Sequence, residues 1–115
     1  MTVKVTKGDS GSVMTVRPTV DGLADALDTN WQCVQSAIDD NGSEIIERSV
    51  VTDKVTVSSK EYFNVVLAPA MTDQVPVLGL YKDLTWVVKV WNSSIIPAYE
   101  KTITESLRIY PPKLP

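Results

Sequence analysis

Apolar and polar residues alternate along most of this chain, and this alternation restricts its fold more than any other feature. The clearest example is Leu84–Trp91 (LTWVVKVW), and the same two-residue period recurs in Thr2–Thr6 and Tyr99–Tyr110. Successive side chains of a strand point to opposite faces, so this period predicts half-buried β-strands rather than helices. We therefore expect an all-β protein.

Turn-forming residues separate the alternating segments at intervals of roughly 8 to 12 residues. The predicted strands are Thr2–Thr6, Ser12–Pro18, Thr29–Ile38, Ser43–Val51, Val55–Val57, Tyr62–Leu67, Leu84–Trp91 and Tyr99–Tyr110. Pro18 cannot donate a backbone hydrogen bond, so it should mark either a sheet edge or the end of its strand. Helix is expected only in short turns near Leu23–Leu27 and Pro69–Gln74. Because Thr2–Thr6 can be either a strand or an extended arm, this gives about seven short strands, which is typical of an antiparallel Ig-like β-sandwich.

One turn has a strong local signal. Asn41-Gly42 stands between two apolar segments, and an Asn-Gly pair there favours a β-hairpin with a type I′ turn, in which both central residues have positive φ. We expect a hairpin between Thr29–Ile38 and Ser43–Val51.

The length of 115 residues fits a single domain that buries one core. We expect residues 1–115 to form one β-sandwich, with 1–11 as a first strand or N-terminal arm and 111–115 as an extended tail. The expected core consists of Trp31, Cys33, Ile45, Val65, Leu67, Trp86, Val88, Val90, Ile103, Leu107 and Ile109.

The composition excludes several kinds of catalytic site. The chain has no histidine, the usual general base at neutral pH and the commonest metal ligand, and it has one cysteine, Cys33. No basic residue stands next to Cys33 in the sequence to lower the pKa of its thiol. The acidic residues show no spacing that singles out an acid–base pair. We therefore expect no enzymatic activity, no cofactor and no metal site.

Charge and hydropathy limit the partners. Eleven basic residues against fourteen acidic ones give a net charge of -3, and the basic residues are scattered. This pattern argues against binding to nucleic acid. No segment approaches the roughly 20 apolar residues of a membrane span, and the N-terminal residues lack the apolar core of a signal peptide. We expect neither nucleic acid nor membrane as a partner.

The order of features between Thr29 and Pro111 resembles Ig-like modules of tailed-phage virion proteins. The similarity is to the N-terminal domain of siphophage upper baseplate proteins and to related tail-fibre and head-associated domains. The matching segments are Trp31 with Asp40-Asn41-Gly42, Leu67-Ala68-Pro69-Ala70-Met71-Thr72, Gly79-Leu80-Tyr81, Trp86-Val87-Val88-Lys89-Val90 and Leu107-Arg108-Ile109. The resemblance implies a structural protein of a phage or prophage, located in the virion and, during assembly, in the host cytoplasm.

Such a protein should act as an assembly or adaptor module of the tail, baseplate or head. Its partners would be other virion proteins and further copies of itself. Val3 and Val5 are the predicted contact residues of an edge strand, and Trp91 is a third candidate because it lies at the end of its strand, on the same face as Lys89. The alternative is a carbohydrate-binding or adhesive β-sandwich that binds glycans with exposed aromatic residues.

Overall fold

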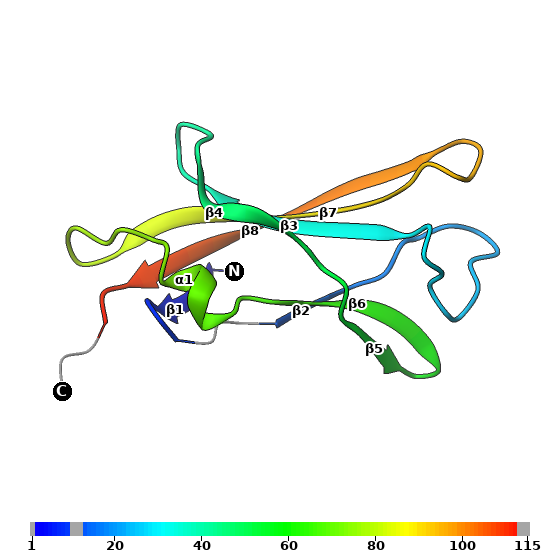
Figure 1. Cartoon of the computed structure of the whole chain (residues 1–115), viewed down its shortest axis with the longest axis horizontal. Coiled ribbons are helices and arrows are strands. Elements are labelled where there is room, and N and C mark those ends of the chain that lie inside the picture. Colours follow the sequence, from blue (N-terminus) through cyan, green and yellow to red (C-terminus); the bar gives the residue numbers. More distant parts are fainter. Residues whose placement is uncertain (1, 10–12, 113–115) are drawn as a thin grey trace.

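Eight strands and one short helix form in the computed structural model, which describes residues 2–9 and 13–112 (Figure 1). They are β1 (Thr2–Thr6), β2 (Val13–Val16), β3 (Gln32–Ile38), β4 (Glu44–Val50), β5 (Lys54–Val57), β6 (Lys60–Val66), α1 (Pro69–Thr72), β7 (Lys82–Asn92) and β8 (Tyr99–Tyr110). The predicted all-β class is confirmed, as is the short helical turn at Pro69. The outer parts of the predicted arm and tail, residues 1, 10–11 and 113–115, and the first residue of the predicted second strand, Ser12, lie outside the described residues.

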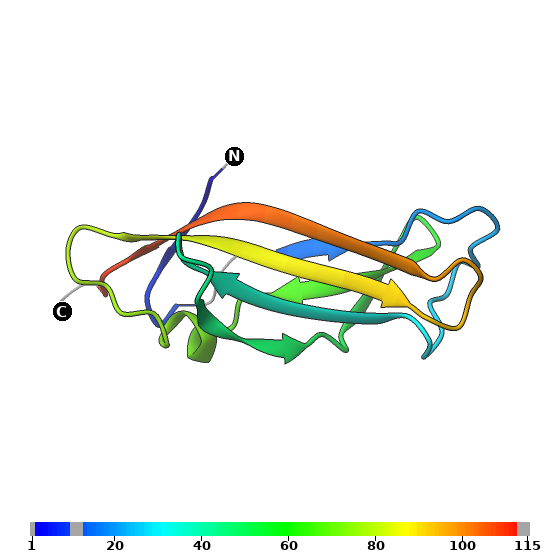
Figure 2. The same cartoon turned by 90° about the horizontal axis from the view of Figure 1, so that it is seen from above.

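The strands form two sheets, one of five strands in the order β1-β8-β7-β3-β4 and one of three in the order β2-β6-β5 (Figures 1 and 2). The prediction of a purely antiparallel arrangement is wrong, because β1 pairs with β8 in parallel. The chain passes from β1 to β2 in the second sheet, to β3 and β4 in the first, to β5 and β6 in the second, and finally to β7 and β8 in the first, where β8 runs alongside β1. Parallel neighbours need such a crossover, and here most of the chain provides it. β2 lies at an edge of its sheet, which is one of the two positions that Pro18 indicated.

β7 and β8 form a long hairpin in continuous register from Lys82↔Ile109 to Asn92↔Tyr99. Trp86, Val88 and Val90 of β7 face the core and are buried, as the alternation predicts. On β8 the same period buries Leu107 and Ile109 but leaves Ile103 half-buried. The inner face of β8 is therefore covered only toward its C-terminal end.

Two tight turns show where positive φ is used. The β3–β4 hairpin forms as predicted, but its turn is not type I′, since only Gly42 has positive φ (82°). Asp39 N–H donates to the Ser43 carbonyl (3.0 Å), which closes a three-residue loop with a bulge at glycine. Ser58 and Ser59, both at positive φ (51° and 69°), instead form the two-residue turn between β5 and β6.

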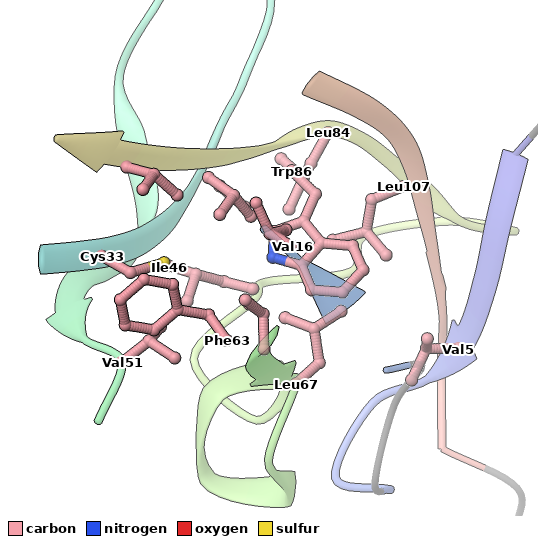
Figure 3. Packing of buried hydrophobic residues seen from close by; sticks show 14 of the residues in the cluster. Val5, Val16, Cys33, Ile46, Val51, Phe63, Leu67, Leu84, Trp86 and Leu107 are labelled. Atoms are coloured by element: carbon pink, nitrogen blue, oxygen red, sulfur yellow. The ribbon is translucent and has the colours of Figure 1, made fainter. Parts of the chain in front are cut away.

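The core lies between the two sheets, and Figure 3 shows Trp86 among side chains of both. The Trp86 indole N–H donates to the Gln35 side-chain oxygen (3.1 Å), and the Gln35 amide donates to the Val66 carbonyl (2.9 Å). This buried pair links the five-stranded sheet to the end of β6. Of the predicted core residues, Ile45 and Ile103 are only partly buried. Ile46 is buried in place of Ile45, because register shifts in the β3–β4 pair change which residues of β4 face inward.

The segment between β2 and β3 is not helical, contrary to the prediction for Leu23–Leu27. The side chains of Arg17, directly after β2, and of Glu61, on β6, anchor it instead. The Arg17 guanidinium donates to the carbonyls of Ala24 (2.7 Å), Asp25 (3.0 Å) and Glu61 (2.7 Å). The Glu61 carboxylate accepts from Leu27 N–H (2.7 Å). Because these bonds satisfy backbone groups directly, the segment needs no helical hydrogen bonds of its own.

Candidate protein-interaction surfaces

An apolar loop projects from one end of the molecule, which measures 50 × 30 × 23 Å. Leu78 and Leu80 flank Gly79 between α1 and β7, and their exposed fractions are 97% and 84%. In Figure 1 this loop forms the yellow-green bend at the left. Exposed apolar side chains that are adjacent in a loop, rather than scattered singly, are typical of a protein contact. We name residues 78–80 the Leu loop.

The base of the Leu loop is fixed by β8. The Arg108 guanidinium lies 3.8 Å from the centre of the Tyr81 ring and donates to the Asp83 carboxylate (2.8 Å). Tyr110 packs edge-on against Tyr81, with ring centres 6.2 Å apart. The Arg108 hydrogen bond lowers the pKa of Asp83, and the same pairing raises the pKa of Arg108. A fixed base lowers the entropy lost when the tip binds a partner.

The opposite end presents a different surface. Ile96 is fully exposed at the tip of the β7–β8 hairpin. A hollow of about 340 Å³ is lined by both apolar and polar residues, among them Trp31, Phe63, Trp91 and Lys54. Trp31 is almost completely buried, so Trp91, which is half-buried, offers the larger accessible ring.

The three predicted contact residues do not form one surface. Val3 and Val5 lie on β1, beside the C-terminal part of β8, whereas Trp91 lies opposite Glu100 near the other end of β8. Val5 is only 6% exposed and Val3 packs partly against the core, so the apolar side chains of β1 contact the protein itself. The outer backbone edge of β1 faces away from β8. A contact made by that edge stays a prediction.

The described residues contain no group of His, Cys, Asp and Glu side chains placed to hold a metal ion. Cys33 is completely buried, and desolvation raises the pKa of its thiol to about 12. A thiol in this setting is a poor nucleophile at neutral pH. Within the same part of the chain, no helix has the length and apolar character needed to cross a membrane.

The Leu loop was missed in the sequence, although its signal is present there. Leu78 and Leu80 come shortly before the predicted strand Leu84–Trp91, so they do not stand out from the alternating apolar residues that follow. Gly79 between two leucines, just after Pro76, instead places both side chains in a turn. A short apolar run bounded by turn formers cannot be assigned to core or surface from periodicity alone.

No protein-family model, curated protein sequence or solved structure matches this chain.

Proposed function

We propose that this chain is a non-enzymatic assembly or adaptor module of a tailed-phage or prophage virion, built as an Ig-like β-sandwich. Two sheets around one core are consistent with that architecture, and β1 would be an addition to it. The resemblance in the order of strands and turns supports the virion assignment. Its partners would be other virion proteins.

The observation on which the proposal depends is the Leu loop on its fixed base. Burying one leucine side chain contributes roughly 1.5–3 kcal/mol, so Leu78 and Leu80 together could supply much of the affinity of a modest contact. The loop lies at the end of the long axis, where a neighbouring subunit can approach without contacting either sheet face. This placement suits an adaptor between larger components.

The test compares particles assembled with wild-type protein and with the double variant Leu78→Ser, Leu80→Ser. We expect incorporation of the variant to fall at least tenfold, because its apolar contact is lost. Ile96→Ser is the matched control, since Ile96 is equally exposed at the opposite end. If the double variant is incorporated at the level of the wild-type protein, the proposed role of the Leu loop is contradicted.

A second candidate function is glycan binding, which the hollow beside Trp91 favours. Trp91 lines this hollow together with the polar residues Gln32 and Lys54, and an aromatic ring next to polar groups can stack on a sugar ring. Titration with a glycan panel should then shift the tryptophan fluorescence, and Trp91→Ala should abolish the shift. No shift with any glycan would exclude this function for the panel tested.

A further inference from the structure

β8 is twelve residues long, but its outer edge is only partly covered. β1 pairs with it from Thr2↔Ser106 to Thr6↔Tyr110. Residues Tyr99–Glu105 pair with β7 on one side, and among residues 2–9 and 13–112 no strand pairs with them on the other. We name Tyr99–Glu105 the open β8 segment. In Figure 2 it is the orange half of β8, at the upper edge of the five-stranded sheet.

The hydrogen bonds of β1 show which backbone groups face this edge. Lys7 N–H donates to the Tyr110 carbonyl (2.8 Å), so the backbone groups of Tyr110 point toward the β1 side. Backbone groups of alternate residues point to the same side of a strand. The N–H and C=O groups of Glu100, Thr102 and Thr104 therefore face the open edge. Such a row of groups is a template for another strand.

The space beneath the edge can accept side chains of an added strand. A hollow of about 670 Å³ lies beside Ile103, and its other lining residues include Arg17, Lys60 and Tyr62. Ile103 is only half-buried on this side. An inward-pointing side chain of an added strand would therefore enter an open space next to an apolar residue, where it would gain burial.

We propose that the open β8 segment pairs antiparallel with the same segment of a second copy of this chain, about a two-fold axis at Thr102. The proposal rests on the assembly role and names the second copy as a partner. Thr102 is the midpoint of Tyr99–Glu105, so this register uses every outward backbone group and ends where β1 begins. Thr102 would face Thr102, and Glu100 would face Thr104 of the second copy, each pair exchanging two hydrogen bonds.

The side chains of the segment are complementary to one another in this register. On the inner face, Lys101 would lie opposite Ile103 of the second copy and diagonal to its Glu105, within reach of a long side chain. Lysine can cover isoleucine with its methylene groups while its ammonium approaches the carboxylate. If the two-fold axis passed through Ile103 instead, Glu100 would lie opposite Ser106 of the second copy. Thr2 of that copy already pairs with Ser106, so β1 disfavours this register.

Two cysteine variants test the pairing and its register in the full chain. Thr102→Cys places the two thiols opposite each other, within the Cα separation that a disulfide allows. Thr104→Cys is the matched control, because Thr104 is also a threonine on the same face of β8. In the proposed register it would lie opposite Glu100 of the second copy, so the two introduced thiols would not meet. We expect Thr102→Cys to form the covalent dimer at least tenfold faster under mild oxidation. Cys33 is buried and should not contribute.

A third variant tests the role of the backbone without a thiol. Thr102→Pro removes one outward N–H group and leaves pairing with β7 intact, as proline allows at an edge. We expect sedimentation velocity to show a concentration-dependent dimer for the wild type and a folded monomer for this variant. A wild type that is monomeric at millimolar concentration, or equal cross-linking of both cysteine variants, would overturn the proposal. If the protein is strictly monomeric but is still incorporated into virions, this pairing alone is overturned. If the protein is absent from particles, the proposed function is overturned.

Discussion

Trp86 is the residue whose side chain contributes most visibly to the contact between the two sheets. It is 1% exposed, and its indole N–H is bonded to Gln35, which is itself buried. Trp86→Ala would leave a cavity and an unsatisfied Gln35 oxygen. We expect the free energy of unfolding to fall by about 3–5 kcal/mol, measured by urea denaturation. Trp91→Ala, on the outer face of the same strand, is the control. If it lowers the free energy of unfolding as much as Trp86→Ala does, the proposed role of Trp86 in the core is contradicted.

Asp83 provides a test of the fixed base of the Leu loop. The hydrogen bond from Arg108 lowers the pKa of the Asp83 carboxyl in the folded protein. The pairing of Asp83 with Arg108 therefore contributes fully to stability above the ordinary aspartate pKa of about 4. This contribution is lost as the pH falls through the lowered pKa of Asp83. An NMR titration of the wild type should show the lowered pKa, and Arg108→Gln should return it toward the ordinary value. An unchanged pKa in Arg108→Gln would contradict the pairing.

At the scale of single elements, the turn between β5 and β6 offers a stabilising change. Ser58 and Ser59 both occupy positive φ, which costs energy for any residue with a Cβ atom. Ser58→Asn with Ser59→Gly supplies the residues that a type I′ turn favours. We expect thermal and urea denaturation to show a gain of about 1 kcal/mol. Ser93→Gly is the control, because Ser93 lies in a turn but does not have positive φ. It should not stabilise the protein, and a gain as large as that of the double variant would contradict the role of positive φ.

The existence of most strands could be predicted because alternation is a local property of the chain. Thr2–Thr6 and Tyr99–Tyr110 have the predicted bounds. Their parallel pairing could not be predicted, since it joins residues from the two ends of the chain and has no local signal. The turn at Ser58-Ser59 was missed because serine is not a typical residue at positive φ.

The candidate surfaces were harder to predict than the strands. Val5 alternates as an edge residue would, but whether its side chain meets a partner or the core depends on which sheet covers it. The open β8 segment likewise depends on how far β1 covers β8, and within the described residues that pairing begins at Thr2↔Ser106. Sequence periodicity identifies a strand and its two faces, but not which part of its edge is covered.

At the scale of the whole molecule, the proposed contacts lie on different parts of an elongated shape. The Leu loop is at one end, and the open β8 segment lies along a sheet edge toward the other (Figure 2). A subunit with two separate contacts can bind a second copy and a different protein at the same time. This arrangement suits a component that is repeated around a symmetric structure.

The proposed role as a structural component of a virion is tested by the copy number of the chain in purified particles. Quantitative mass spectrometry of density-gradient-purified particles should find the chain at a fixed ratio to the other structural proteins. A structural component should keep that ratio through repeated purification, because its contacts hold it in the particle. Absence of the chain, or a ratio that falls at each purification step, would contradict the proposed role.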